Sequence, residues 1–237
     1  MSLLLNVQGL QSFYGVSQIL HGIDLQVRPG EQIALLGRNG MGKTTFLRSL
    51  MGMMPRTLGD IDLHGIGVRG KLPETIARAG VALVPEGRGV FGSLTVIENL
   101  IMAARPGPSG KQGWTLDRVL SVFPRLAQRR NNGGQQLSGG EQQMLTIGRA
   151  LMTNPDLILI DEATEGLAPL IAQEIWKTLD IIRSEGIATI VVDKDIRSLS
   201  RVADRVVIMS KGRLVFEGSP GELAASGDLL ERHLGVQ

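Results

Sequence analysis

The sequence predicts an α/β fold with a β-rich opening and a helical insertion. Short apolar runs typical of buried strands recur along the chain, at residues 32–36, 81–84, 157–160 and 188–192. Stretches whose apolar residues have helical spacing alternate with these runs, and the longest covers 169–185. A glycine-rich loop joins the first buried run to a helix expected at 45–51. Alternation of strands and helices is the pattern of an α/β domain.

The opening of the chain is expected to be rich in β-structure. Residues 4–10 and 23–27 alternate apolar and polar side chains, as half-exposed strands do. A turn at 28–31 leads into the strand at 32–36. After the helix at 45–51 we expect a strand and turn at 59–65, a short helix at 73–78 and a buried strand at 81–84.

Helical spacing then replaces the strand pattern, first at 95–104 and again at 116–128. A loop at 105–110 separates the two segments, and a glycine-rich segment at 131–134, expected to be flexible, closes this part of the chain. We therefore expect a single domain of 237 residues, with core segments at 1–86 and 136–237 and a helical insertion at about 87–135.

The remainder returns to the alternating pattern. We expect a long helix at about 140–152, a strand at 157–160, a helix at 169–185, a strand at 188–192 and a helix at 196–203. A hairpin of 206–209 with 213–217 and two short helices within 221–235 complete the chain.

Composition excludes several classes of protein. Hydrophobic residues make up 43% and aromatic residues only 3%, so the core is expected to be aliphatic. No apolar run reaches the roughly 18–20 residues that span a bilayer, and the N-terminus lacks the basic region of a signal peptide. Cysteine is absent, which excludes disulfides and thiolate metal sites and suits a cytoplasmic protein. With a net charge of +2 and no basic block, we expect no nucleic-acid partner.

The glycine-rich loop fits the phosphate-binding pattern G-x-x-x-x-G-K-[ST]. It consists of Gly37, Arg38, Asn39, Gly40, Met41, Gly42, Lys43, Thr44 and Thr45. Its glycines let the backbone curl so that several N–H groups point at phosphate oxygens, and the helix N-terminus adds partial positive charge. Lys43 would reach the β- and γ-phosphates, and the Thr44 hydroxyl would ligate Mg²⁺. The alternative is a glycine-rich turn with a chance lysine, but the flanking strand and helix are the context that the motif requires.

Two adjacent acids, Asp161 and Glu162, end the buried run at 157–160. Open α/β sheets bind ligands at the carboxyl ends of their strands, and successive strand residues point to opposite sides. We therefore expect Asp161 to hold Mg²⁺, directly or through water, and Glu162 to polarise the attacking water as a general base. The alternative is a solvated acidic turn, which the P-loop about 120 residues earlier disfavours.

A third candidate comes directly before the helix at 140–152. It consists of Leu137, Ser138, Gly139, Gly140, Glu141 and Gln142. Ser138 and Glu141 form a capping box, so this segment could be only the start of a helix. Two glycines beside a serine at a helix N-terminus also form an anion site. Within one subunit the P-loop already fills the phosphate site, so a second phosphate-binding element is useful only across a dimer interface.

The segment 137–142 resembles the signature motif of ATP-binding-cassette (ABC) ATPases, and the resemblance covers essentially the whole chain. It implies the P-loop NTPase fold of that family, with an N-terminal antiparallel β subdomain and an inserted α-helical subdomain. It also implies ATP hydrolysis with Mg²⁺, and a second ABC ATPase subunit packed head to tail. Each ATP would touch the P-loop of one subunit and Ser138, Gly139 and Gly140 of the other. Tyr14 stands where the family places an aromatic side chain on adenine; without the resemblance it would be an ordinary core or surface tyrosine.

Residues 84–91 and 94–100, with 161–169, are similar to the LivF-type subunit of branched-chain amino acid importers. That resemblance implies a homo- or heterodimer of cassettes and two integral-membrane permease subunits at the cytoplasmic face of the inner (plasma) membrane, with a periplasmic solute-binding protein as an indirect partner. Urea and amide importers use a very similar subunit, so branched-chain amino acids and these small polar solutes remain open as substrates.

Three residues depart from the common family pattern. Glu86 replaces a glutamine, and its carboxylate could still ligate Mg²⁺ or orient water. Ala168 replaces an aspartate and removes a polar contact across the dimer. Lys194 occupies the place of the switch histidine and stays charged at pH 7. We hypothesise that Lys194 contacts the γ-phosphate as a fixed cation; it could also pair with Glu162 and weaken the base, or be a solvated lysine at a strand end.

The leading interpretation is a transport ATPase whose ATP-driven dimer closure moves membrane subunits. The other class is a non-transport ABC ATPase that acts as an ATP-gated interaction module. Such modules often contain long coiled coils or duplicate the cassette, and neither feature is present in this sequence. A P-loop kinase is disfavoured because it would not need the motif at 137–142.

Overall fold

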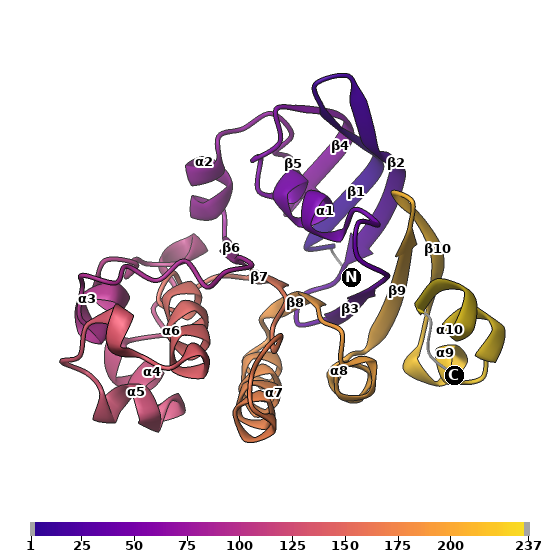
Figure 1. Cartoon of the computed structure of the whole chain (residues 1–237). Helices are drawn as coiled ribbons and strands as arrows, with labels where there is room; N and C mark the ends of the chain where they lie inside the picture. Colours follow the sequence, from indigo (N-terminus) through magenta and orange to yellow (C-terminus); the bar gives the residue numbers. More distant parts are fainter. Residues whose placement is uncertain (1–2, 235–237) are drawn as a thin grey trace.

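The computed structural model describes residues 3–234, which form two sheets with helices packed around them (Figure 1). The larger sheet has six strands in the order β10-β9-β3-β8-β7-β6. They are β3 (Gln32–Leu36), β6 (Val81–Val84), β7 (Leu157–Asp161), β8 (Ala188–Val192), β9 (Arg205–Ser210) and β10 (Arg213–Gly218). Neighbouring strands are parallel except β10, which runs antiparallel to β9. The buried strands expected from continuous apolar runs are confirmed.

The smaller sheet is antiparallel, in the order β2-β1-β4-β5. It contains β1 (Leu5–Tyr14), β2 (Ser17–Val27), β4 (Arg56–Leu63) and β5 (Ile66–Gly67). The expected strand at 23–27 is thus only the end of β2, and β1 continues well past residue 10. The register shifts near Gly9 and Gly22, both at positive φ, interrupt the alternation by which strands are recognised in sequence. The fold of the opening was predicted, but the length of this hairpin was not.

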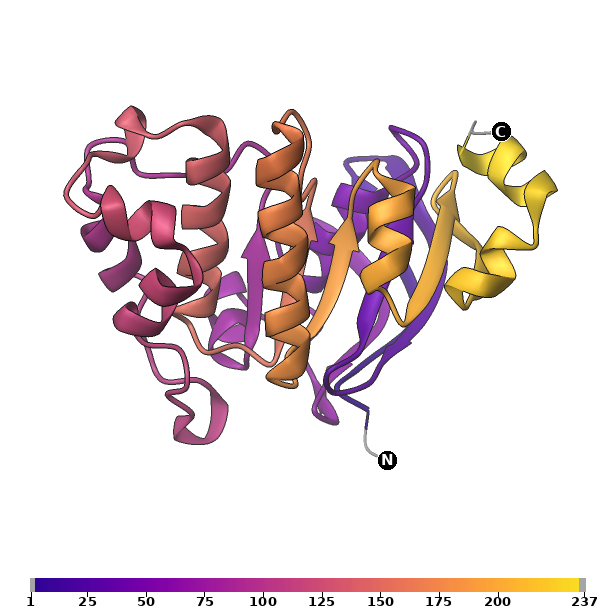
Figure 2. The same ribbon diagram turned by 90° about the horizontal axis from the view of Figure 1, so that it is seen from below.

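Side chains of the large sheet point alternately into two hydrophobic clusters. Ala34 and Leu36 belong to one cluster, while Ile33 and Leu35 belong to the other. Figure 2 shows that three helices cover the first of these faces. They are α6 (Gly139–Leu151), α7 (Pro169–Ser184) and α8 (Ile196–Val202). The other face packs on α1 (Lys43–Leu50) and the antiparallel sheet, so the loop between β3 and α1 lies at the edge where both layers meet.

The helical segment expected at about 87–135 contains α3 (Val96–Ile101), α4 (Leu116–Val122) and α5 (Pro124–Gln128), which lie beside α6 at one end of the large sheet (Figure 1). The helical spacing expected at 116–128 corresponds to two helices, because Pro124 lacks the N–H that would continue α4 and instead begins α5. The helix expected at 95–104 is shorter: Thr95 caps it in a capping box with Glu98, and its last residue is Ile101.

The segment at 131–134, expected to be flexible, is fixed by backbone hydrogen bonds. Gly133 forms a β-bridge with Thr95, and Gly134 donates its N–H to the Leu94 carbonyl at 2.9 Å. A Cβ on Gly134 would collide with Val90, so this glycine permits close packing rather than freedom. The division of the chain into a core and an inserted subdomain stays a prediction.

Four other α-helices belong to the described chain; three lie where they were expected, and one begins earlier than expected. α2 (Pro73–Arg78), α9 (Pro220–Ala224) and α10 (Gly227–Leu234) agree with the short helices expected there; residue 235, the expected end of the last one, lies outside the described residues. α1 begins at Lys43 rather than at Thr45, so the lysine belongs to the first turn of the helix. Within residues 3–234, no helix is both long and apolar enough to cross a bilayer.

Candidate nucleotide-binding site

The loop from Gly37 to Gly42 leaves the carboxyl end of β3 in a conformation that only glycine adopts easily. Its three glycines, Gly37, Gly40 and Gly42, have φ values of 146°, 76° and 105°. A Cβ on Gly37 would collide with the Met209 carbonyl oxygen, and one on Gly42 would lie 3.1 Å from a Leu20 methyl group. The loop therefore runs close against the neighbouring backbone while its open side stays free of side chains.

Lys43 opens α1, and its ammonium group curls back over the loop. Its Nζ donates hydrogen bonds to the carbonyl oxygens of Gly37 at 2.7 Å and Arg38 at 3.0 Å. Burial lowers the pKa of Lys43, while the nearby carboxylates of Asp161 and Glu162 act in the opposite direction. Lys43, the residue predicted to bind the phosphates, thus contacts the carbonyl groups of the loop and is close enough to Asp161 and Glu162 to interact with their charges.

The loop and the acids face the same cleft, which has a volume of about 420 Å³. It is lined by Ile19, Asn39, Gly40, Gly42, Lys43, Thr44, Thr45, Glu86, Asp161, Glu162 and Val192. Residues from β2, the β3–α1 loop, the end of β6, β7 and β8 meet here, although they span most of the chain. The structure therefore brings the P-loop and all three acids of the sequence-predicted site together.

Asp161 is the last residue of β7, and its side chain is only 3% exposed. Its Oδ1 atom is buried without a hydrogen-bond partner. Burial raises the pKa of Asp161, whereas a hydrogen bond from the Thr44 side chain opposes the rise. A buried carboxylate oxygen without a donor is costly unless a cation or another donor satisfies it.

This donor set fits Mg²⁺. Thr44, Glu86 and Asp161 present hydroxyl and carboxylate oxygens to one cleft, and hard oxygen ligands are what Mg²⁺ prefers. Over residues 3–234, no group of three acidic, histidine or cysteine side chains is arranged to hold a metal ion by itself. Mg²⁺ sites commonly use only one or two carboxylates and complete the shell with water and substrate phosphates.

Glu162 follows Asp161 in a left-handed conformation, with φ of 59°, which is uncommon for a residue with a side chain. A hydrogen bond with Glu165, together with burial and the negative charge of Glu165, raises the pKa of Glu162 to about 7. A carboxylate with this pKa is suited to accept a proton near neutral pH. The backbone strain and the raised pKa both occur at the residue predicted to act as the base.

Lys194 does not pair with Glu162, as one of the sequence hypotheses allowed. Its ammonium forms an ion pair with Glu165, and Glu165 in turn shares a hydrogen bond with Glu162. The hydrogen bond with Glu165 raises the pKa of Lys194, and hydrogen bonds with Glu162 and Lys194 lower the pKa of Glu165. The sequence analysis missed Glu165, although a second glutamate three residues after Glu162 was a visible signal.

Asp193 is a second residue that the sequence analysis missed. It is buried, and its Oδ2 accepts hydrogen bonds from the backbone N–H and the hydroxyl of Thr164 at 2.6 and 2.8 Å. Its other oxygen accepts the N–H of Asp195 at 2.8 Å. These bonds tie the loop after β7 to the loop after β8, which places Lys194 within reach of Glu165.

The motif at 137–142 lies at the N-terminus of α6, and none of its residues lines the P-loop cleft. The capping box is present: the Glu141 N–H donates to Ser138 Oγ at 3.3 Å, and the Ser138 N–H donates to Glu141 at 2.8 Å. Leu137 is buried and anchors the turn, while Ser138 is exposed. A side chain on Gly140 would collide with Ile171, so both the cap and the close packing of α6 on α7 are built into this sequence.

Tyr14 ends β1 with 43% of its surface exposed and does not line the cleft. Ile19, on the facing strand β2, lines it instead. The stacking of Tyr14 on adenine stays a prediction.

A glycine loop after one parallel strand, with an acid-tipped strand two places along the sheet, defines a P-loop nucleotide-binding protein. The chain belongs to the ABC transporter family, whose sequence profile matches residues 20–165. Over 98% of this chain and the full length of the relative, it is 38% identical to the high-affinity branched-chain amino acid transport ATP-binding protein BraG of Pseudomonas aeruginosa. It is also 30% identical to the lipopolysaccharide export system ATP-binding protein LptB of Escherichia coli, over 98% of this chain and 97% of LptB.

Solved structures agree with this assignment. The ATP-binding subunit of an ABC transporter superposes with a TM-score of 0.83 at 28% identity, over 98% of this chain and 96% of the other. A nucleotide-free ATP-binding cassette from an ABC transporter gives a TM-score of 0.84 at 21% identity, over 99% of both chains, and supports the fold. The predicted ABC ATPase fold and the family resemblance are therefore confirmed, and the chain is an ATPase subunit of a transporter. Because the relatives include both an amino acid transport protein and an export protein, the family does not fix the direction or the solute.

Proposed function

We propose that this subunit drives an importer of branched-chain amino acids or related small polar solutes such as urea and amides. The observation that carries the proposal is the end-to-end match with the branched-chain amino acid transport protein BraG. The subunit would work at the cytoplasmic face of the plasma membrane, with a second cassette, two permease subunits and, indirectly, a periplasmic solute-binding protein.

In the proposed reaction, the P-loop N–H groups bind the phosphates of ATP, and Lys43 leaves its loop carbonyls to pair with the β- and γ-phosphates. Mg²⁺, held by Thr44 and Asp161 with Glu86 nearby, would neutralise charge that develops on the phosphates. Glu162 orients the attacking water and takes its proton. Most of the catalysis is positioning and charge stabilisation, since phosphoryl transfer needs little covalent chemistry from the protein.

The motif at 137–142 would complete the site of a second cassette. Ser138 is exposed, and neither it nor the first turn of α6 lines the subunit's own cleft, so this anion-binding helix end is available to another subunit. A single chain should therefore bind ATP but hydrolyse it poorly, and full turnover should require closure of a dimer.

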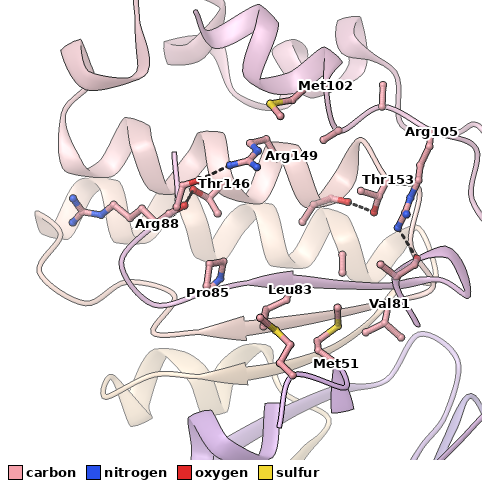
Figure 3. Close-up of a pocket in the computed structure, with 17 residues that line it drawn as sticks. Met51, Val81, Leu83, Pro85, Arg88, Met102, Arg105, Thr146, Arg149 and Thr153 are labelled. Carbon is pink, nitrogen blue, oxygen red and sulfur yellow. Dashed lines mark hydrogen bonds between the residues drawn. The ribbon is translucent and has the colours of Figure 1, made fainter. Parts of the chain in front are cut away.

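A groove beside α6 is the surface that we propose for the permease. It has a volume of about 630 Å³ and lies between β6, the end of α1, α3 and α6 (Figure 3). Met53 and Met102 are 51% and 53% exposed at the groove, and flexible methionines suit an adaptable protein contact. Arg105 and Arg149 add positive charge, which favours a partner segment that carries carboxylates.

Purification from native membranes followed by reconstitution tests the proposal. The tagged chain should co-purify with two polytopic membrane proteins, and vesicles containing the complex and its solute-binding protein should accumulate leucine, isoleucine or valine when ATP is supplied. Urea and acetamide serve as the other solutes of the proposal. ATP-dependent export instead of accumulation, or ATPase activity without any membrane partner, would contradict it.

A further inference from the structure

The segment that joins β5 to α2 combines exposed cations with exposed aliphatic side chains. This segment, residues 64–72, is called the 64–72 loop below; it contains Arg69 and Lys71, both exposed, and no carboxylate. Ile66 and Leu72 of the same loop are 67% and 62% exposed. Large apolar side chains that gather on an exposed surface indicate a site of contact with another molecule or a membrane.

The base of the 64–72 loop is fixed to the rest of the chain. Val68, in its middle, is only 6% exposed. His64 Nε2 lies 3.1 Å from a carboxylate oxygen of Asp156, and a Cβ on Gly52 would collide with the Lys71 carbonyl. The backbone of the loop therefore packs closely against its neighbours, and the exposure of its side chains is a property of a well-packed segment.

The cations of the 64–72 loop are available to a partner. None of the ion pairs within residues 3–234 involves Arg69 or Lys71. Gly65 and Gly70 have φ values of 76° and 75°, and a Cβ on either glycine would meet no atom within 4 Å. At these positions the loop faces open space, in contrast to the groove beside α6.

The 64–72 loop is continuous with the groove that we propose for the permease. In Figure 1 the loop leads from β5 directly into α2. Ala77 of α2 lines that groove together with Met53 and Arg105. Burial and, to a lesser extent, the like charge of Arg78 in α2 lower the pKa of Arg105, so these two guanidinium groups are near each other. Positive charge therefore extends from the loop along α2 to the edge of the groove.

A membrane surface fits the 64–72 loop better than a second protein does. Anionic headgroups attract basic side chains, and aliphatic side chains enter the boundary between headgroups and acyl chains. A helix of a protein partner needs a groove in which to bury its apolar face, as the groove beside α6 provides. Two separate aliphatic side chains on an open loop would bury little area against a rigid protein, whereas lipids adapt to them.

We propose that the 64–72 loop is a contact site for anionic phospholipids, with Arg69 and Lys71 at the phosphate groups and Ile66 and Leu72 in the interfacial layer. A subunit whose groove holds the permease would then also touch the lipid beside it, and the loop would fix the cassette against the membrane surface. The position of the lipid next to the permease rests on the proposed function, whereas lipid binding itself is a property of the single chain.

The first test is co-sedimentation of the single chain with vesicles. The wild type should bind vesicles of equal parts phosphatidylglycerol and phosphatidylethanolamine, and binding should weaken at high salt and on phosphatidylcholine vesicles. The double substitution Arg69→Gln and Lys71→Gln should lower the partition coefficient about thirtyfold, and Ile66→Ser should lower it about tenfold. All variants should retain ATP affinity, because none of these residues lines the P-loop cleft.

The matched control removes two exposed cations elsewhere, by Arg197→Gln and Arg201→Gln in α8. This helix packs on the other face of the large sheet from the 64–72 loop. The control should bind anionic vesicles as the wild type does. Failure of the wild type to bind anionic vesicles, equal binding to phosphatidylcholine vesicles, or equal losses in the loop and control variants would overturn the proposal.

The second test places the site in the assembled transporter. The chain contains no cysteine, so Ile66→Cys gives a single position for a fluorophore, attached before assembly. In nanodiscs of anionic lipid this label should be quenched by spin-labelled lipids, and a label at Arg201→Cys should not. Absence of lipid quenching at position 66 would overturn the lipid site, and shielding of that label from aqueous iodide would then assign the loop to a protein partner. Failure to co-purify membrane proteins would contradict the proposed function alone, since the vesicle experiment does not depend on them.

Discussion

Removal of the charge on Glu165 should shift the pH dependence of hydrolysis. Glu165 is the first cause of the raised pKa of Glu162, which stands at about 7 instead of its ordinary 4.5. In Glu165→Gln the negative neighbour is lost and Lys194 is released toward Glu162, and both changes lower the pKa of Glu162. The proposed base would then be ionised over a wider range of pH.

The size of the effect follows from the fraction of Glu162 that is ionised. With a pKa of about 7, roughly half of the side chains carry a charge at pH 7 and about a tenth at pH 6. If the pKa returns toward 4.5, nearly all are ionised at both values. The variant should therefore exceed the wild type by up to about twofold at pH 7 and up to about tenfold at pH 6.

The assay is the pH profile of kcat/KM for ATP hydrolysis by the assembled transporter, since this ratio reports groups of the free enzyme. Glu174→Gln is the control, because Glu174 is also an exposed, ion-paired glutamate but pairs with Arg125 of α5, and neither residue lines the P-loop cleft. An acidic limb that stays near pH 7 in Glu165→Gln would refute the assignment of Glu162 as the titrating base. If the acidic limb moved to lower pH in both variants, the shift would come from the loss of one negative charge on the protein and not from the contact of Glu165 with Glu162.

Three further changes test the remaining parts of the site. Glu162→Gln should bind ATP normally, lower turnover by at least about a hundredfold and accumulate the closed dimer on gel filtration; near-normal turnover would reject its role as base. Lys194→His should speed turnover and weaken ATP affinity if the lysine is a fixed cation on the γ-phosphate; identical turnover and affinity would count against this contact. Because the pair of Lys194 with Glu165 is exposed, it contributes little to stability, and the melting temperature should hardly change. Met102→Glu should leave ATP binding intact but abolish stimulation of the ATPase by solute and binding protein, and retained stimulation would move the permease contact elsewhere.

Much of the fold could be predicted because buried parallel strands are continuous apolar runs. The runs at 32–36, 81–84 and 188–192 match β3, β6 and β8 residue for residue. The antiparallel hairpin was predicted less well, since its bulges shift the alternation on which recognition depends. Pro124 was visible in the sequence, yet the helical spacing continued across it, and spacing alone does not show where a helix is interrupted.

The P-loop and the acids of β7 were predictable because each is a local motif attached to a strand end. Contacts between distant loops were not. Glu165 and Lys194 are 29 residues apart and meet only because β7 and β8 are neighbours in the sheet. The hydrogen bond from Thr146 of α6 to the Arg88 carbonyl likewise depends on a strained turn, which the secondary-structure propensities of the residues cannot reveal.

The departure at Lys194 is best understood together with Glu165. A lysine near the γ-phosphate adds a permanent positive charge, but its ion pair with Glu165 makes the local addition neutral. Asp193 holds both loops in place through Thr164, so the pair does not depend on two freely moving side chains. The pair is exposed, so a phosphate bound beside Glu162 could compete with Glu165 for the ammonium. If it does, Glu165 is left beside Glu162 without its counter-charge, and the pKa of Glu162 rises further while ATP is bound. In the wild type the acidic limb of kcat should then lie at higher pH than that of kcat/KM, because only the bound state has lost the counter-charge. In Lys194→His a neutral imidazole leaves Glu165 without a counter-charge with or without ATP, so the two limbs should coincide; coincident limbs in the wild type would reject the competition.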